Sequence, residues 1–344
     1  MTLHNPSNPS NAFVRFMRQV YYPIGFKKGY NFILWFICAG AMTGFVLSRL
    51  QYLSIDGIFK AGSAPGEWYY YSKKFYHFGI TLHLSTILPA GLLAMLQFTP
   101  FIRYKALIFH RINGYIVVLL LLLGNVGALM IARHAFGGTL STQLLVGVLA
   151  IATTSSATLS YYNIKMLQID QHRAWMLRCW FYAGSIITLR IILIITALII
   201  SRLDSFNIAI SCDQIAFSSG DEAAAVYPGC NVTADGVWTG YTAVHASFGK
   251  SLIETAAAFQ LSFGMAGWLA FLLHAIGVEL YLNLTPAESE RLRRVSYERQ
   301  LERGFSHPGS AGLTVDRLGD AEQWMPPATN PDTKALKDSE SETK

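Results

Sequence analysis

The hydrophobic positions of this chain gather into six long runs, separated by polar or basic stretches. The runs are Phe32 to Leu50, Phe75 to Phe98, Ile112 to Ala132, Gln143 to Met166, Ala174 to Ser201 and Ile253 to Leu282. About 20 mostly apolar residues are enough for a helix to cross the hydrocarbon core of a bilayer. Strands of a membrane barrel would be about half as long and would alternate in polarity, which these runs do not. The pattern predicts an all-α bundle of six membrane spans over residues 31–283.

The composition agrees with a membrane location. Of the 344 residues, 52% are hydrophobic and only 14% are charged, which is unusual for a soluble domain. The net charge of +6 raises the question of nucleic acid, but the basic residues flank the runs and do not form one soluble face. We therefore expect the lipid bilayer as a partner and no nucleic acid.

The basic residues also predict an orientation. They precede the first run, lie between runs two and three, flank the connection between runs four and five, and follow the sixth: Arg15, Arg18, Lys27, Lys28, Arg103, Lys105, Arg111, Lys165, Arg173, Arg178, Arg291, Arg293 and Arg294. With six crossings all of these fall on one side, which the positive-inside rule makes the cytosol. Both termini are then cytosolic, although Lys60, Lys73, Lys74 and Arg133 are exceptions to the pattern.

The loop over residues 202–250 supports the same orientation. It contains the sequon that begins at Asn231 and two cysteines, Cys212 and Cys230. A glycan on Asn231 and a disulfide between the cysteines would both require a lumenal or extracellular loop. The chain is therefore expected in the endomembrane system or plasma membrane of a eukaryotic cell.

Two segments lie outside the bundle. Residues 1–30 form a cytosolic N-terminal segment, basic and aromatic from Phe13 to Tyr30, which we expect on the membrane face. Residues 284–344 are polar and poor in apolar residues. We expect them to form a cytosolic tail that is largely disordered after a short helix.

Two His-Arg pairs open the third and fifth runs. They are His110 with Arg111 and His172 with Arg173, and Arg178 follows the second pair. Histidines on facing helices can ligate a b-type haem while arginines pair with its propionates. Two alternatives remain: the arginines bind lipid phosphates while the histidines hydrogen-bond helix ends, or the histidines transfer protons. His83 and His134 are the next candidate ligands for haem iron.

A second polar set lies inside the runs, toward the 202–250 loop. It consists of His83, Asn125, Arg190 and Glu254. Ionisable side chains within a membrane face a cavity or a partner. One interpretation is an ion pair between Arg190 and Glu254 that fixes two helices. The other is a polar cavity for a ligand, formed by all four residues.

These motifs resemble a known family. The matching residues run from His83 to Gln97, then His110-Arg111 with Gly114-Tyr115, His172-Arg173 with Trp175-Met176 and Arg178, and finally Arg190. They resemble the predicted membrane proteins called domain of unknown function 2306, found in bacteria and fungi. The resemblance covers the second to fifth spans, about residues 75–201. The loop, the sixth span and the tail look like fungal elaborations. No general activity is assigned to the family, so the resemblance implies a fold.

In outline the chain is also similar to the four-helix b-type cytochromes. Those commonly place two histidines thirteen or fourteen residues apart on one helix, for two stacked haems. Here Gln97 stands fourteen residues after His83, and Gly124 fourteen after His110. The departure favours one haem, or none, over a two-haem electron path.

Two classes of function remain open. The first is a haem-b redox protein or oxidoreductase-like membrane subunit with a redox partner. The second is a cofactor-free transporter, receptor or scaffold with a buried ligand site, or a membrane enzyme acting on a lipid-soluble small molecule. The sequence contains no P-loop, dinucleotide fingerprint or nucleophile elbow.

Overall fold

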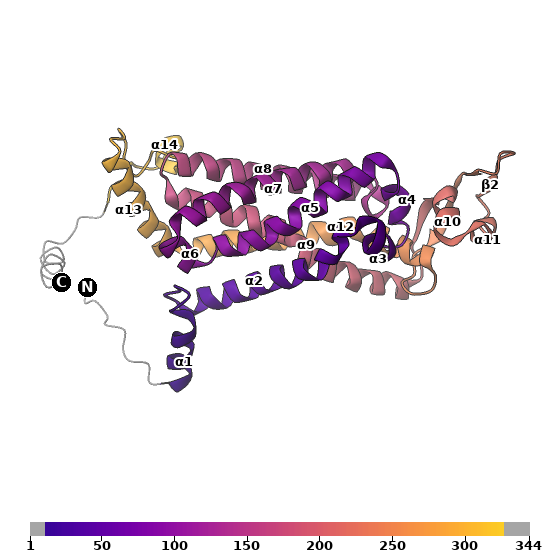
Figure 1. The fold of residues 1–344 in the computed structure, drawn as a ribbon, viewed down its shortest axis with the longest axis horizontal. Coiled ribbons are helices and arrows are strands. Elements are labelled where there is room, and N and C mark those ends of the chain that lie inside the picture. The colour runs from indigo at the N-terminus through magenta and orange to yellow at the C-terminus, as the bar shows by residue number, and fades with distance from the viewer. Residues whose placement is uncertain (1–10, 327–344) are drawn as a thin grey trace, which may run out of the picture. The chain divides into compact units, whose positions relative to one another are not determined.

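Six helices are long and apolar enough to cross a membrane in the computed structural model, which describes residues 11–326. They are α2 (Gly29–Arg49), α5 (Lys74–Gln97), α7 (Leu107–Ile131), α8 (Leu140–Lys165), α9 (Ile169–Leu203) and α12 (Leu252–Asn283). Figure 1 follows them along the chain. Each coincides with one predicted run, so the all-α, six-span prediction is confirmed. The orientation of the termini stays a prediction.

Shorter elements connect these six helices or flank them. They are α1 (Ala12–Tyr21), η1 (Leu50–Leu53), η2 (Ile55–Phe59), α3 (Lys60–Gly62), α4 (Glu67–Tyr71), α6 (Pro100–Lys105), η3 (Ala135–Gly138), β1 (Asn207–Ser211), α10 (Cys212–Ser219), α11 (Asp221–Ala225), β2 (Asn231–Val232), β3 (Trp238–Thr239), β4 (Tyr241–His245), α13 (Pro286–Glu302) and α14 (Val315–Leu318). Within the described residues the chain forms two compact units, one of residues 11–154 and 180–275, the other of residues 155–179 and 276–326.

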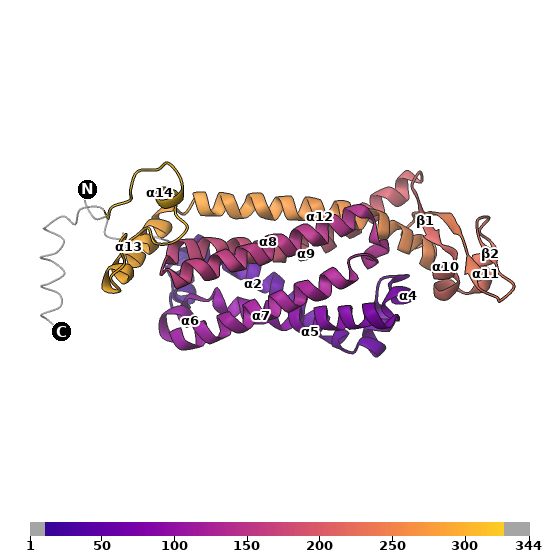
Figure 2. The same ribbon diagram turned by 90° about the horizontal axis from the view of Figure 1, so that it is seen from above.

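In the first unit, α5 and α7 are in backbone contact and lie side by side in both ribbon views (Figures 1 and 2). A Cβ atom on Gly127 would lie 2.5 Å from the backbone nitrogen of His83 and 2.8 Å from the carbonyl oxygen of Gly79. Small residues allow membrane helices to approach this closely. The contact fixes the position of His83 against α7.

The loop between α9 and α12 is held together by a two-stranded sheet and a disulfide. Strands β1 and β4 pair antiparallel, with Asn207 opposite His245. Cys212 and Cys230 form a disulfide with their Cα atoms 5.5 Å apart, which confirms the predicted bridge. Asn231 is exposed on β2. Its glycosylation stays a prediction.

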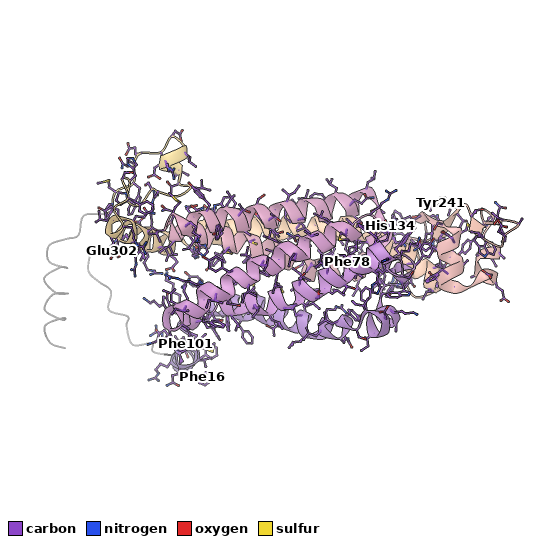
Figure 3. The ribbon with its side chains drawn as sticks, turned by 45° about the horizontal axis from the view of Figure 1, so that its top comes forward. Phe16, Phe78, Phe101, His134, Tyr241 and Glu302 are labelled. Atoms are coloured by element: carbon purple, nitrogen blue, oxygen red, sulfur yellow. A yellow bond between two sulfur atoms is a disulfide. The ribbon has the colours of Figure 1, made fainter. Side chains whose placement is uncertain are left out.

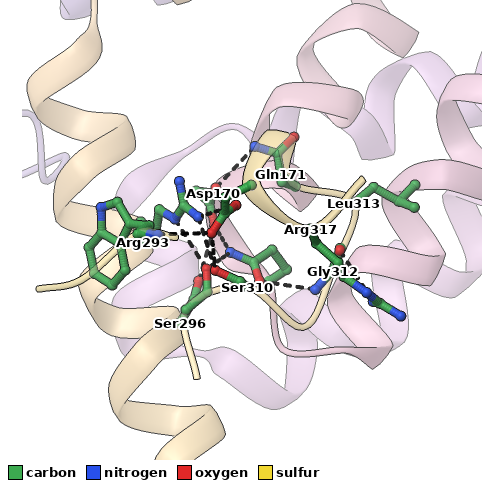
Figure 4. A network of polar contacts seen from close by, with 12 residues as sticks. Asp170, Gln171, Arg293, Ser296, Ser310, Gly312, Leu313 and Arg317 are labelled. Carbon is green, nitrogen blue, oxygen red and sulfur yellow. Dashed lines mark hydrogen bonds and ion pairs between the residues drawn. The ribbon is translucent and has the colours of Figure 1, made fainter. Parts of the chain in front are cut away.

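In the second unit, part of the expected tail is ordered. Helix α13 and the segment that follows it pack on the turn between α8 and α9 through polar side chains (Figure 4). The buried Asp170 carboxylate accepts hydrogen bonds from Gln168 Nε2 at 2.8 Å and from Ser296 Oγ at 3.2 Å. Composition suggested disorder because apolar side chains are few here, but buried amides and hydroxyls hold the segment instead. Residues 327–344 lie outside the described residues.

Candidate functional site: a buried polar cluster around Arg190

The short helix α4 carries a buried acid into the first unit. Gly66 precedes it with φ at +81°, a left-handed conformation that glycine adopts without steric cost. This turn directs Glu67 inward, where only 3% of its surface stays exposed. The hydroxyl of Tyr71, one helical turn later, donates to Glu67 Oε2 at 2.9 Å.

The backbone of η3 supplies two more donors to this carboxylate. The N–H groups of Phe136 and Gly137 donate to Glu67. Both residues have positive φ, +47° and +73°. Their successive N–H groups converge on one carboxylate, as turn conformations of the backbone do around anions. A left-handed backbone is unfavourable for phenylalanine and persists only where the surrounding structure imposes it.

Burial raises the pKa of Glu67 from its ordinary value of 4.5 to about 7. The N–H groups of η3, the Tyr71 hydroxyl and the charge of Arg190 oppose this rise, but they do not cancel it. Glu67 therefore exchanges its proton near neutral pH. Its charge, and with it the net charge of the cluster, changes in the physiological range.

Arg190 extends from α9 into an aromatic environment. Its guanidinium carbon lies 4.9 Å from the ring centroid of Phe136 and 5.5 Å from that of Phe263, and the two rings stack at 4.0 Å. Arginine interacts favourably with aromatic faces, more strongly when both are removed from water. The buried Nε of Arg190 finds no hydrogen-bond acceptor among residues 11–326.

Gln260 on α12 presents a second unused donor beside the same loop. A Cβ atom on Gly137 would lie 2.5 Å from Gln260 Oε1, so the amide sits directly against η3. Gln260 is 4% exposed, and its Nε2 is without an acceptor in the described part of the chain. An unsatisfied buried donor costs about 1–3 kcal/mol, and such groups in native structures are exceptions that call for an explanation.

His83 completes the cluster from α5. Its Nδ1 lies 2.8 Å from the carbonyl oxygen of Gly124. Because a carbonyl only accepts, Nδ1 must carry the proton, and in the neutral ring the lone pair then lies on Nε2. Arg190 is close enough to act electrostatically on the ring. The cluster thus combines a neutral base, a guanidinium and a titratable acid.

The structure brings together two of the four residues of the predicted outer cavity. His83 and Arg190 belong to one cluster, whereas the Asn125 amide donates to Thr153 and Thr154 hydroxyls on α8, both at 3.0 Å. Glu254 lies 3.7 Å from His245 of β4. No ion pair joins Arg190 to Glu254 among the described residues, so that interpretation is corrected.

The reason is depth along the helices. Glu254 is in the first turn of α12, whereas Arg190 lies thirteen residues before the end of α9, about 20 Å along the axis at 1.5 Å per residue. On α12 it is Phe263, nine residues after Glu254, whose ring lies 5.5 Å from the Arg190 guanidinium carbon. Sequence analysis missed Glu67, whose one signal was an acid followed directly by four aromatic residues.

The residues of the second His-Arg pair have protein partners within the second unit. His172 Nδ1 lies 2.7 Å from Ser160 Oγ. Arg178 forms a two-point ion pair with Glu279, at 2.6 and 2.9 Å. Arg173 donates to Thr285 Oγ1 at 3.3 Å. Arg178 is thus charge-paired with a carboxylate of the protein, while Arg173 donates to hydroxyl groups.

The first pair and His134 belong to the other unit. His110 and Arg111 lie in the first two turns of α7, where the His110 carbonyl accepts from Gln97 Nε2 at 3.0 Å and Arg111 is exposed. His134 stacks on Tyr70 with ring centroids 4.1 Å apart, and burial lowers its pKa. Within residues 11–326, no three His, Cys, Asp or Glu side chains group as they would to hold a metal ion. Haem binding stays a prediction.

Comparisons with known proteins place these residues in a family context. The chain is 27% identical over 321 residues to Ava biosynthesis cluster protein G of Aspergillus versicolor, an alignment that covers 79% of this chain and 94% of that protein. No solved structure matches the chain. Residues 80–213 match the family described as predicted membrane protein (DUF2306).

The matched segment contains His83, both His-Arg pairs, Phe136 and Arg190, whereas Glu67 and Gln260 lie outside it. The resemblance that the paired motifs carried is therefore confirmed over the second to fifth spans. Residues 80–213 of this integral membrane protein match the family of predicted membrane proteins described as DUF2306.

Proposed function

We propose that this protein binds a lipid-soluble small molecule at the Arg190 cluster and acts in its biosynthesis. The observation that carries the proposal is the buried Nε of Arg190, a strong donor without an acceptor in the described chain. The relative in Aspergillus versicolor is named as a biosynthesis cluster protein, which supports a biosynthetic role.

The cluster favours a particular kind of ligand. A guanidinium pairs best with a carboxylate or carbonyl oxygen, and the Gln260 amide offers a second unused donor against η3. The stacked rings of Phe136 and Phe263 provide an apolar surface next to these donors. A hydrophobic molecule with one oxygen acceptor satisfies both features, and such a molecule enters through the bilayer.

The same groups support proton transfer as the reaction. Arg190 would polarise a carbonyl, which makes the neighbouring C–H bond more acidic, and the lone pair on His83 Nε2 would accept that proton. The proton would then return to another atom of the same molecule. Such an isomerisation needs no oxidant, reductant or further reactant.

The test uses full-length protein purified from a fungal host, with bound small molecules extracted into organic solvent and identified by mass spectrometry. We expect wild-type protein to retain a compound with a carbonyl or carboxylate group. Arg190→Gln should retain at least about tenfold less, because a hydrogen bond to a charged group contributes about 1.5–3 kcal/mol. Arg202→Gln is the matched control, since Arg202 lies on the same helix but in its last turn.

Deuterated water extends this experiment to catalysis. Wild-type protein should introduce deuterium into the bound compound, and His83→Gln should retain the compound without exchange. Retention without exchange by both proteins would indicate a transporter or receptor instead. Equal retention by Arg190→Gln and the control would contradict the proposed site.

The haem prediction is tested on the same samples. A Soret band that shifts when dithionite reduces the protein would establish a b-type cytochrome. Loss of that band in a His110→Ala/His172→Ala variant would identify these histidines as its ligands. Arg173 and Arg178, engaged with protein partners, give this prediction no support.

A further inference from the structure

Helix α1 has three distinct faces. At 100° per residue, Phe13, Phe16 and Val20 share one face, and their side chains are 66%, 61% and 38% exposed. Arg15 and Arg18 lie on the opposite face. A short helix that exposes a phenylalanine stripe opposite arginines is typical of segments that lie in a membrane interface.

The third face of α1 fixes the helix on the bundle. Tyr21, at its end, packs with Phe26 and with Phe32 of α2, and the rings of Tyr21 and Phe32 are 5.9 Å apart. Figure 1 shows α1 running across the direction of α2. Because α2 is a candidate membrane span, this crossing places α1 along a membrane surface.

The connection after α1 joins a second short helix to the same surface. The N–H of Phe101 on α6 donates to the Ile24 carbonyl at 2.9 Å, and Gly25, with φ at +95°, lets the chain turn closely against Pro100. Phe101 is 51% exposed and, in Figure 3, lies at the same end of the first unit as Phe16. The apolar side chains of α1 and α6 thus form one exposed edge.

The charges around this edge all have one sign. The basic residues form what we call the basic surface: Arg15, Arg18, Lys27, Lys28, Arg103 and Lys105. The sequence holds no acidic residue before Asp56 and none between Gln97 and Gly114. Within residues 11–326 none of the six forms an ion pair, and the buried Nε of Arg18 has no acceptor. Counter-charges for this surface must therefore come from outside residues 11–326.

We propose that the basic surface binds the headgroups of anionic phospholipids while Phe13, Phe16 and Phe101 enter the boundary between headgroups and acyl chains. Each lysine or arginine near an anionic bilayer adds to the attraction, and the buried aromatic area adds to it independently. The cytoplasmic leaflet is the anionic one, which agrees with the predicted cytosolic N-terminus. This inference is independent of the Arg190 cluster.

The experiment places full-length protein in bilayer nanodiscs of equal phosphatidylserine and phosphatidylcholine, then releases it and counts the retained lipids by native mass spectrometry. Wild-type protein should retain phosphatidylserine in preference to phosphatidylcholine. The variant Arg15→Gln/Arg18→Gln/Lys27→Gln should lower this preference at least about tenfold, given the contribution of each charge. Raising the salt concentration should lower it in wild-type protein as well.

The matched control removes three arginines whose charges are paired within α13, in the variant Arg291→Gln/Arg294→Gln/Arg299→Gln. Their partners are Glu288, Glu290 and Glu302. The control should keep the wild-type preference. If the first variant does not fold, Lys27→Gln/Lys28→Gln replaces it, because both side chains are exposed. Equal lipid preference in the test and control variants, or no preference in wild-type protein, would overturn the proposal.

Discussion

The variant Cys212→Ser/Cys230→Ser is expected to lose about 3 kcal/mol of unfolding free energy, the usual contribution of a disulfide that closes a loop of this length. The bridge joins residues separated by 18 positions. It holds the start of α10 against the loop that leads to β2. Without it, the unfolded loop gains conformational freedom that the folded chain must give up.

Removal of the disulfide should also affect the candidate site, because α10 contacts the helix that carries Glu67. Asp213 and Gln214 directly follow Cys212, and both contact α4: Asp213 accepts from the Tyr69 hydroxyl, and Gln214 Nε2 donates to the Gly66 carbonyl at 3.2 Å. Helix α4 carries Glu67 into the cluster. A loosened α10 therefore weakens the position of Glu67, and retention of the bound compound should fall together with stability.

Thermal unfolding in detergent, followed by tryptophan fluorescence, measures the effect. Reduction of wild-type protein should reproduce the behaviour of the double variant. Cys38→Ser is the control, because Cys38 is a free, exposed cysteine on α2. Unfolding temperatures that agree between the double variant and wild-type protein would show that the disulfide does not stabilise this part of the chain.

The fold could be predicted because membrane crossing imposes a strong and local rule. Each span needs a long apolar run, and a run is visible without knowledge of its neighbours. The pair His172 and Arg173 was placed at the start of a helix for the same reason, since it leads directly into such a run. The disulfide was predicted because its two cysteines share one loop.

The candidate site was only partly predictable because its parts meet through tertiary contacts. His83 and Arg190 stood out as polar residues in apolar runs. Glu67 did not, because it lies outside the six apolar runs, in a helix of only five residues. In the folded protein, the Glu67 carboxylate is held by N–H groups of Phe136 and Gly137, whose backbone is left-handed. No sequence pattern predicts that backbone conformation. The sequence placed Arg190 and Glu254 toward the same loop but did not fix their depth along the helices, which misplaced Glu254.

The stability of the protein is expected to fall as pH rises from about 4.5 to about 7. The folded-state pKa of Glu67, about 7, lies above its ordinary value of 4.5. Between these values the folded chain keeps a proton that the unfolded chain releases, so each increase in pH favours unfolding. A difference of about 2.5 pKa units corresponds to about 3 kcal/mol, and since Glu67 is 3% exposed, solvent screens little of it.

Unfolding temperatures across this pH range test the prediction. Glu67→Gln should remove the decrease, because glutamine keeps an oxygen acceptor for the N–H groups of η3 but does not titrate. Glu222→Gln, at an exposed site on α11, should keep the wild-type dependence. A wild-type dependence that survives in Glu67→Gln would assign it to other groups.

The same proton sets the charge that Arg190 presents to a ligand. Below pH 7 Glu67 is mostly neutral, so its charge no longer offsets that of the guanidinium, which should attract a carboxylate more strongly. Above pH 7 the ionised Glu67 offsets that charge. Retention of a carboxylate-bearing compound should therefore decrease from pH 6 to pH 8 in wild-type protein and stay constant in Glu67→Gln. A neutral carbonyl ligand would show a much weaker dependence, so this measurement also distinguishes the two classes of ligand.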